Sequence, residues 1–370
     1  MHITSLEVKN FRCFTSFKHT FIGPLILIEG PNGSGKTSLL EALHYACYGK
    51  SFRTSTPEEL IQHASDIFFI KLELQEEGEQ HVLQLGFSKD KKSIKIDGKK
   101  ITTYKELLHH YRAITITEDD ILIIKGSPDQ RRSFLDQAVL LHYPHAAASF
   151  KLYRKILKQR TALLLAQTWD NTSFELWTEQ LWQIAQQITH FRLQLLNALE
   201  QETNRLLKKF FPEFSTISLL YKPSCTITSW EQWVSLYSYR ERQAQRTLFG
   251  PHLDDFEILS AGKMAKTYAS RGQQKLLAVL LKIAHFSLIT QQTGKQAVIL
   301  LDDFMTDFDD NRVYALIDLL IEKKANLICT VPTQNSSLAL HLRAYGAQHL
   351  KLEIDTFIPS LQVPSPETQI

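Results

Sequence analysis

The segment Leu25–Gly49 constrains the fold of this chain more than any other part of its 370 residues. The apolar run Leu25–Ile28 predicts a buried strand, and an apolar spacing typical of one helix face begins at Leu39. Between them, the pattern Gly-x4-Gly-Lys-Thr predicts a loop whose backbone N–H groups, together with the N-terminus of the following helix, bind phosphate groups. The residues that we assign to nucleotide binding are consecutive: Gly30, Pro31, Asn32, Gly33, Ser34, Gly35, Lys36 and Thr37.

Two side chains of this loop have specific predicted roles. Lys36 is expected to contact the β- and γ-phosphates of a nucleoside triphosphate and so to take part in catalysis. The hydroxyl group of Thr37 is expected to bind Mg²⁺. The alternative, a glycine-rich turn that binds nothing, is disfavoured by the strand before the loop and the helix after it. The loop therefore predicts nucleotide binding.

A second motif closes the apolar run Ala297–Leu301, which predicts a buried strand next to the strand of the phosphate loop. Asp302 is expected to hold the water shell of the metal ion. Asp303 is expected to face the γ-phosphate and to orient or deprotonate the attacking water. The alternative is an acidic cap on a core strand. Because most of the chain separates Lys36 from Asp302, we expect an inserted domain between the two halves of the nucleotide site.

A third motif, Ser-Arg-Gly-Gln-Gln-Lys, begins at Ser270 and precedes the strongly apolar helix predicted at Leu276–Ile289. The Ser270 hydroxyl, the Gly272 N–H group and the helix dipole predict a second anion site, to which we also assign Gln273. The chain's own phosphate loop is already filled in this scheme, so the second site is expected to serve the ATP of a second subunit. A plain helix N-cap is the alternative.

The composition of the chain limits the class of protein to which it can belong. The chain is 44% hydrophobic and 22% charged, which is ordinary for a soluble globular protein of two or three domains. Its formal net charge of +3 is too small for a basic surface over the whole molecule, so any basic surface is local. The four cysteines lie far apart and form no CxxC pair, as expected of reduced thiols. With no signal peptide and no membrane-length apolar run expected, the predicted location is cytoplasmic.

The periodicity of the sequence changes twice along the chain. Alternating runs separated by turns predict antiparallel strands between residues 67 and 96, whereas unbroken apolar runs predict a parallel sheet covered by helices. An apolar stripe from Phe150 to Leu164 and a second one, at steps of three and four, from Trp177 to Leu195 predict two helices. The turn Asp170–Ser173 between them makes the pair a helical hairpin. We therefore expect an α/β chain with three segments: the first part of the nucleotide-binding domain in residues 1–144, a helical insert in 145–246, and the second part in 247–370.

Together these motifs resemble the RecF family of recombination mediator ATPases, which are related to ABC and SMC heads. The agreement runs through most of the chain outside the helical insert. Beyond the three motifs above, it includes the segments Asn10–Arg12, Thr117–Leu122, Lys125–Pro128, Arg131–Asp136 and Gly250–Asp255.

The resemblance implies an ABC/SMC-type P-loop ATPase head, with mixed antiparallel and parallel sheets and helices, that carries the helical insert. It implies ATP and Mg²⁺ as cofactors, an ATP-dependent homodimer with ATP between the two heads, and slow hydrolysis. It also implies binding to DNA, favouring single-strand/duplex junctions at gaps, and action with RecO and RecR in loading recombinase on single strands. By resemblance alone, Arg12 is a candidate phosphate or interface contact.

The chain departs from the family pattern at Leu253, where the family usually has arginine. Thr330 stands where ABC transporters carry a switch histidine, and the transporter-type glutamine of the Q-loop is not evident. Both features disfavour a transport ATPase and favour slow hydrolysis.

A basic patch is the candidate DNA contact, and a solvated helix face is its alternative. Phosphate contacts would make binding depend on salt, with a log–log slope of about −0.9 per phosphate neutralised. The patch consists of Lys151, Arg154, Lys155, Lys158 and Arg160 on one predicted helix, together with Lys208, Lys209, Arg240, Arg242 and Arg246 near the far end of the insert.

Two other functions stay open at this point. A metabolic P-loop kinase or GTPase would not dimerise with ATP, and the absence of an Asn-Lys-x-Asp motif disfavours the GTPase. A non-hydrolysing scaffold would bind ATP without releasing phosphate.

Overall fold

The computed structural model of the chain describes residues 2–76, 78–89, 91–101, 107, 111–166, 170–294, 297–303, 308–333 and 336–353. The chain separates into two compact units. Unit 1 consists of residues 1–117 and 296–370, so the two ends of the chain belong to one unit. Unit 2 is the continuous segment 118–295.

Unit 1 contains two sheets. In the six-stranded antiparallel sheet the strand order is β2-β1-β4-β5-β6-β7, with the bounds β1 (His2–Phe11), β2 (Phe14–Thr20), β4 (Ile67–Glu76), β5 (Glu79–Ser88), β6 (Lys91–Ile96) and β7 (Lys99–Ile101). In the five-stranded parallel sheet the order is β14-β3-β13-β12-β8, with the bounds β3 (Leu25–Gly30), β8 (Ala113–Ile116), β12 (Val298–Leu301), β13 (Asn326–Pro332) and β14 (Gln348–Lys351). The expected combination of antiparallel hairpins and a parallel sheet is confirmed.

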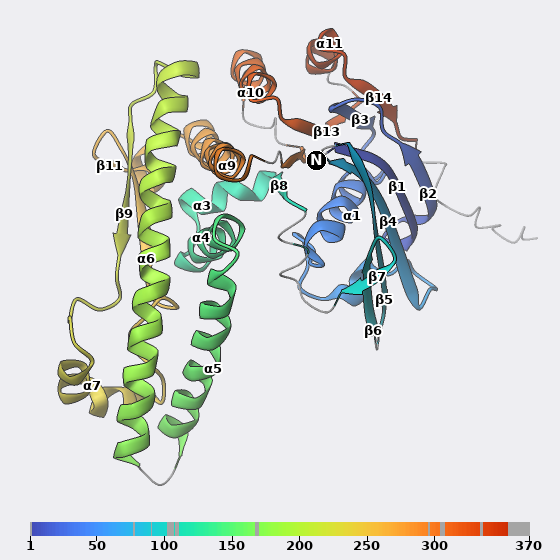
Figure 1. The fold of residues 1–370 in the computed structure, drawn as a ribbon. Helices are drawn as coiled ribbons and strands as arrows, with labels where there is room; N and C mark the ends of the chain where they lie inside the picture. The colour runs from blue at the N-terminus through green and yellow to red at the C-terminus, as the bar shows by residue number, and fades with distance from the viewer. Residues whose placement is uncertain are drawn as a thin grey trace, which may run out of the picture. The chain divides into compact units, whose positions relative to one another are not determined.

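Helix α1 (Lys36–Tyr48) lies between the two sheets of unit 1 and contacts strands of both (Figure 1). Every residue from Ser38 to Tyr48 is buried, because the helix has a sheet on each side. Helices α10 (Asp310–Glu322) and α11 (Ser336–Ala344) cover the other face of the parallel sheet, and a short 3-10 helix, η1 (Pro57–Leu60), follows α1 in the chain. The parallel sheet is thus covered on both faces, as its unbroken apolar strands require.

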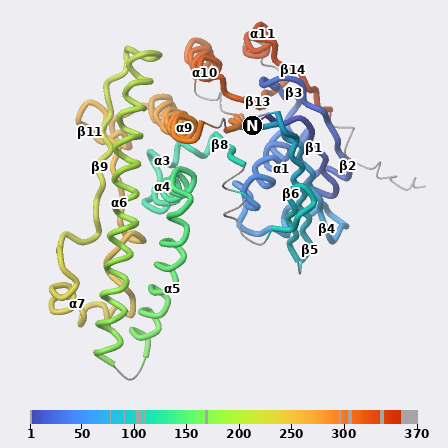
Figure 2. Tube along the Cα trace, in the orientation of Figure 1, coloured from blue at the N-terminus to red at the C-terminus, as the bar shows by residue number. Residues whose placement is uncertain are grey.

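The order of the parallel strands corrects one expectation from the sequence. Strand β13 lies between β3 and β12, so the strand that ends at the two aspartates is not next to the strand of the phosphate loop. Figure 2 shows the C-terminal strands of unit 1 in orange and red beside the blue strand β3. Fully buried parallel strands have similar apolar sequences, and their order depends on the helical crossovers between them, which a strand's own residues do not encode.

Unit 2 is mainly helical. Helices α5 and α6 pack along one another as the expected hairpin (Figure 1). Helix α7 packs against both of them, near the C-terminal end of α5 and the N-terminal end of α6. A three-stranded antiparallel sheet with the order β11-β10-β9 completes the unit. The bounds are η2 (Glu118–Ile121), α3 (Leu122–Lys125), α4 (Pro128–His142), α5 (Ala146–Leu165), α6 (Asn171–Phe210), β9 (Ile217–Lys222), α7 (Trp230–Ala244), β10 (Asp255–Ser260), β11 (Lys263–Met264), α8 (Ala265–Tyr268) and α9 (Arg271–Thr293).

The limits of unit 2 differ from those of the segment 145–246. The long helix α6 packs against α4, which precedes that segment, and against α9, which follows it. These helices therefore share one core. The division into residues 1–144, 145–246 and 247–370 remains a prediction from sequence character.

Helix α9 corrects the expectation that no apolar segment has the length of a membrane span. Among the residues that the structure describes, it is the one helix that is long and apolar enough to cross a membrane. However, 67% of its most apolar stretch is buried inside the protein, and it packs against α3, α4 and α6. Burial of this kind is typical of the core helix of a soluble protein.

Candidate nucleotide-binding site

The phosphate loop of unit 1 connects the end of β3 at Gly30 to the start of α1 at Lys36. Gly33 and Gly35 have φ angles of 85° and 87°, in the left-handed region that glycine adopts at little cost. A Cβ atom at Gly35 would lie 2.6 Å from the ring of Phe14, so a side chain does not fit there. The loop therefore curves as its sequence predicts, and the first N–H groups of α1 point away from the helix body.

Lys36 closes over the loop that precedes it. Its ammonium group donates hydrogen bonds to the carbonyl oxygens of Gly30, at 2.7 Å, and Pro31, at 2.9 Å. Burial lowers the pKa of Lys36, and the nearby carboxylates of Asp303 and Asp302 oppose this shift. The loop also contains Ser34, whose buried hydroxyl has no hydrogen-bond partner among the described residues. The site thus combines a partly buried cation with a buried hydroxyl that makes no hydrogen bond to the described residues, which fits an anionic ligand.

Thr37 and Asp302 meet at the start of α1. The Thr37 hydroxyl donates a hydrogen bond of 3.0 Å to Asp302 Oδ1, and the Thr330 hydroxyl donates to the same oxygen at 3.0 Å. Asp302 is only 8% exposed, and burial raises the pKa of its carboxyl group against the effect of the two hydroxyls. The structure therefore brings together the two residues that the sequence assigns to the metal.

Asp303 follows Asp302 at the end of β12 but differs from it in conformation and exposure. Its φ angle is 44°, in the left-handed region, and its side chain is exposed. Its N–H group donates a hydrogen bond of 3.1 Å to the Thr330 hydroxyl. Of the two adjacent carboxylates, one is therefore buried against Thr37 and the other is open to solvent.

The residues present fit a hydrated magnesium ion. Magnesium usually keeps several waters and takes few ligands from the protein, all of them oxygens. Because the Thr37 hydroxyl donates its hydrogen bond to Asp302, the lone pairs of the Thr37 oxygen remain available for a cation. Across the described part of the chain there is no group of three or more histidine, cysteine, aspartate or glutamate side chains that could hold a metal. The Thr37 hydroxyl and the Asp302 carboxylate are the oxygen groups that would hold such an ion at this site.

Arg12 lies in unit 1, and its guanidinium group donates hydrogen bonds to other residues of the protein. Its guanidinium forms two hydrogen bonds of 2.8 Å with the Glu41 carboxylate and one of 2.9 Å with the Glu59 carbonyl. The Glu41 side chain is fully buried in α1, so this pair anchors the end of β1 to the helix of the phosphate loop. Sequence reasoning missed Glu41, because nothing local marks a carboxylate on the buried face of a helix.

In unit 2, Ser270 is the N-cap of α9. Its hydroxyl accepts a hydrogen bond of 3.3 Å from the Gln273 N–H group, and the Gln273 side chain accepts one of 2.8 Å from the Ser270 N–H group. This is a capping box, which agrees with the helix N-cap that the sequence offers as the alternative to an anion site. Gly272 lies in the first turn, where N–H groups have no acceptor within the helix.

The candidate DNA residues Lys151, Arg154, Lys155 and Lys158 are all exposed on α5. Arg160 on the same helix is not part of this surface. It is fully buried, paired with Glu241, and hydrogen-bonded to Thr178 and Thr247. Its place in the basic patch was therefore predicted wrongly, since a charge in the sequence does not reveal a buried partner 81 residues away.

The segment Gly250–Asp255 is held by arginines of α4. Arg131 forms a two-bond pair with Asp255 at 2.8 and 2.7 Å, and Arg132 donates to the Asp254 carbonyl at 2.7 Å. Leu253 lies in a turn closed by its N–H bond to Gly250, and is 39% exposed. Two separate segments of the resemblance, Arg131–Asp136 and Gly250–Asp255, are thus one structural contact.

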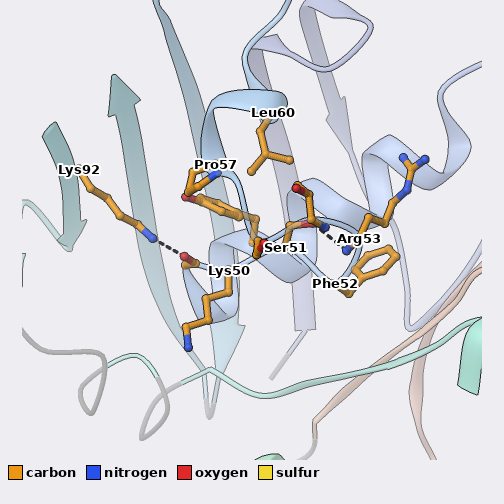
Figure 3. Close-up of a pocket in the computed structure, with 11 residues that line it drawn as sticks. Lys50, Ser51, Phe52, Arg53, Pro57, Leu60 and Lys92 are labelled. Atoms are coloured by element: carbon orange, nitrogen blue, oxygen red, sulfur yellow. Dashed lines mark hydrogen bonds between the residues drawn. The ribbon is translucent and has the colours of Figure 1, made fainter. Parts of the chain in front are cut away.

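A cavity of about 640 Å³ lies at the C-terminal end of α1, at the other end of that helix from the phosphate loop. Figure 3 shows Lys92 reaching across it from β6 toward the helix end, with Lys50 and Arg53 also on its wall. Lys92 donates a hydrogen bond to the Gly49 carbonyl, and its ammonium lies 4.7 Å from the centre of the Tyr45 ring. Lys92 therefore caps α1 from outside the helix.

Comparison with known proteins agrees with this geometry. The profile of the family described as RecF/RecN/SMC N terminal domain matches residues 2–347. The DNA replication and repair protein RecF of Exiguobacterium sp. is 30% identical over 89% of this chain and 92% of its own length. RecF of Acholeplasma laidlawii is 32% identical over 84% of this chain and 88% of its own length.

Solved structures extend the likeness to the fold. The recombination mediator protein RecF with ATP superposes with a TM-score of 0.83 and 26% identity, over 90% of this chain and 93% of that chain. An SMC head bound to the winged-helix domain of ScpA has a TM-score of 0.53 at 16% identity, over 92% of each chain, which is a likeness of fold alone. The chain therefore has an ABC/SMC-type ATPase fold and belongs to the RecF family.

Proposed function

We propose that this protein is an ATP-dependent DNA-binding protein of recombinational repair and replication-fork maintenance. The observation that carries the proposal is the hydrogen bond between Thr37 and Asp302, which joins the phosphate loop to the second nucleotide motif. Family membership and the likeness to a RecF structure with bound ATP support the same function.

Within this proposal, the N–H groups of the loop Gly30–Thr37 and the ammonium of Lys36 bind the triphosphate. Thr37 and Asp302 hold Mg²⁺, which when bound would neutralise charge on the phosphate oxygens. Asp303 orients the attacking water and accepts its proton, a role that its exposed carboxylate permits. Arg12 would approach a phosphate or a subunit interface only through donors that its pair with Glu41 leaves over.

We further propose that two copies close on ATP. Ser270, Gly272 and Gln273 of one copy would complete the phosphate site of the other, using the first turn of α9 as an anion site. Binding of ATP would then favour the dimer, and slow hydrolysis would open it. Such a dimer acts as a timed clamp on DNA.

The DNA partner is expected at gaps and single-strand/duplex junctions, bound without reading of sequence, with Lys151, Arg154, Lys155 and Lys158 as candidate phosphate contacts. RecO and RecR are the proposed protein partners, and the cytoplasm is the proposed location. These assignments rest on family membership, and they are supported by the similarity to a RecF protein that acts as a recombination mediator in the RecFOR pathway.

The test is the mass of the protein in solution, measured by light scattering with Mg²⁺ and no nucleotide, ADP, or a non-hydrolysable ATP analogue. We expect a dimer only with the ATP analogue, and a monomer when Ser270→Arg places a bulky cation at the start of α9. The control is Ser229→Arg, which alters the N-cap of α7 in the same unit. A monomer with every ligand would contradict the clamp and favour a single-site kinase.

A further inference from the structure

The middle strand of the nucleotide site carries a residue to which the sequence assigns no role of its own. Strand β13 separates β3 from β12, with Thr330 beside Ile28 of β3 and Cys329 beside Leu301 of β12. One residue farther along, Thr330 comes level with Asp302. It is 1% exposed and lies between the strand of the phosphate loop and the two carboxylates.

The Thr330 hydroxyl forms a hydrogen bond with each of the two aspartates. It donates to Asp302 Oδ1 at 3.0 Å and accepts the Asp303 N–H group at 3.1 Å. A hydroxyl has one proton and two lone pairs, so these two bonds are compatible. The Leu301 carbonyl, at 3.4 Å, is a weaker acceptor for the same proton.

The hydrogen bonds of Thr330 to Asp302 and Asp303 lie where the chain leaves the parallel sheet at the end of β12. The Asp302 N–H group still donates to the Ile116 carbonyl of β8, at 2.8 Å, in continuation of the strand pairing. The next residue, Asp303, turns into the left-handed region, with a φ angle of 44°. A non-glycine residue in this region costs conformational energy, which surrounding bonds must offset. The Thr330 hydroxyl supplies the hydrogen bond that the Asp303 N–H group would otherwise have made to a strand.

We propose that Thr330 is a positioning residue for ATP hydrolysis. Its hydroxyl holds Asp302 against Thr37 and fixes the backbone of Asp303, so that one carboxylate stays at the metal and the other faces the attacking water. Thr330 acts through the two aspartates and has no assigned contact with the nucleotide. The inference rests on the proposed function and adds to it the residue that fixes the geometry of the carboxylate pair.

The test compares Thr330→Val, which keeps the shape of the side chain but has no hydroxyl, with Thr330→Ser, which keeps the hydroxyl. With Val we expect kcat to fall at least about tenfold, because misplaced catalytic groups cost rate more than binding. Affinity for an ATP analogue should change by less than about threefold, because the phosphate loop is untouched. Ser should restore the rate.

A second measurement needs no nucleotide. In the protein without nucleotide, the Asp303 amide hydrogen should exchange faster in Thr330→Val than in the wild type, and Ser should restore its protection. The matched control is Thr115→Val, a buried threonine of β8 whose hydroxyl contacts His44 instead. It should change neither the rate nor the exchange. If Thr330→Val does not fold, as judged by circular dichroism, Thr330→Ala takes its place.

Wild-type turnover together with a protected Asp303 amide in the folded Val or Ala variant would overturn the inference, and so would slowed turnover without faster exchange. Asp303→Asn separates this result from failure of the proposed function. If that variant hydrolyses ATP like the wild type, Asp303 is not the base. If it is inactive while Thr330→Val is fully active, only the role of Thr330 is wrong.

Discussion

Thr37 and Asp302 form a hydrogen bond of 3.0 Å although they are 265 residues apart in the chain. The bond joins the first residues of α1 to the end of β12, and both belong to unit 1. The two halves of the nucleotide site are thus joined directly within one unit. The segment 118–295 between them forms a unit of its own.

The first prediction concerns this pair. Thr37→Val should weaken magnesium-dependent binding of an ATP analogue about tenfold, because the variant lacks one oxygen ligand and one charge-assisted hydrogen bond. The measurement is a titration of the analogue at several Mg²⁺ concentrations. Thr161→Val is the control, since the Thr161 hydroxyl donates its hydrogen bond to the Leu157 carbonyl in the preceding turn of α5. Equal affinities for all three proteins would show that Thr37 does not hold the metal.

The second prediction concerns the exposed carboxylate. Asp303→Asn should bind ATP, accumulate as dimer and lose turnover by at least about 100-fold, because an amide cannot accept the proton of the attacking water. Phosphate release and light scattering on the same sample check both parts. Hydrolysis at the wild-type rate would place the base elsewhere.

The third prediction concerns the basic face of α5. Replacing Lys151, Arg154, Lys155 and Lys158 by glutamine should weaken DNA binding and reduce the log–log salt slope by up to about 0.9 for each DNA phosphate that is no longer neutralised. A matched variant that removes four exposed lysines of unit 1 is the control, namely Lys89, Lys91, Lys99 and Lys100. If both variants reduce the slope equally, the effect reflects total charge and not a site on α5.

The fourth prediction concerns the buried ion pair of Arg160 and Glu241, whose side chains are both fully buried. Arg160→Met alone should lower the free energy of unfolding by about 3–5 kcal/mol, because it leaves the Glu241 charge buried without its partner. Arg160→Met with Glu241→Leu should cost less than the single change, since no buried charge remains. Denaturant unfolding of the two variants measures this difference. A double variant that is as unstable as Arg160→Met, or less stable, would contradict the prediction.

The fifth prediction concerns Lys92, whose pKa is lowered from 10.5 to about 8, mainly by burial and also by Lys50. Because the unfolded chain binds this proton more tightly, the free energy of unfolding should rise with pH between about 8 and about 10.5. Lys92→Met should lack this rise. Unfolding measured at both ends of the window in wild type and variant tests it, and identical pH profiles would show that the Lys92 pKa is unshifted.

Local sequence patterns were sufficient for several parts of this protein. The phosphate loop of Gly30–Thr37 depends on glycine conformations and on a strand and a helix that adjoin it in the chain. The helical hairpin follows from a periodicity within α6, and the antiparallel strands follow from alternation and turns. Each of these signals arises from residues close together in sequence, where backbone sterics and one-sided burial act directly.

Other features depended on contacts between distant segments. The place of β13 between β3 and β12 follows from helical crossovers, and it alone brings Thr330 to the two aspartates. Likewise, Arg160 is buried in an ion pair with Glu241, and Arg12 forms an ion pair with Glu41. The chemistry of the nucleotide motifs could be predicted from the residues alone, because it belongs to residue types at fixed spacing. The partners of those residues depend on the fold, because hydrogen bonds and burial require segments that lie far apart in the chain to become neighbours.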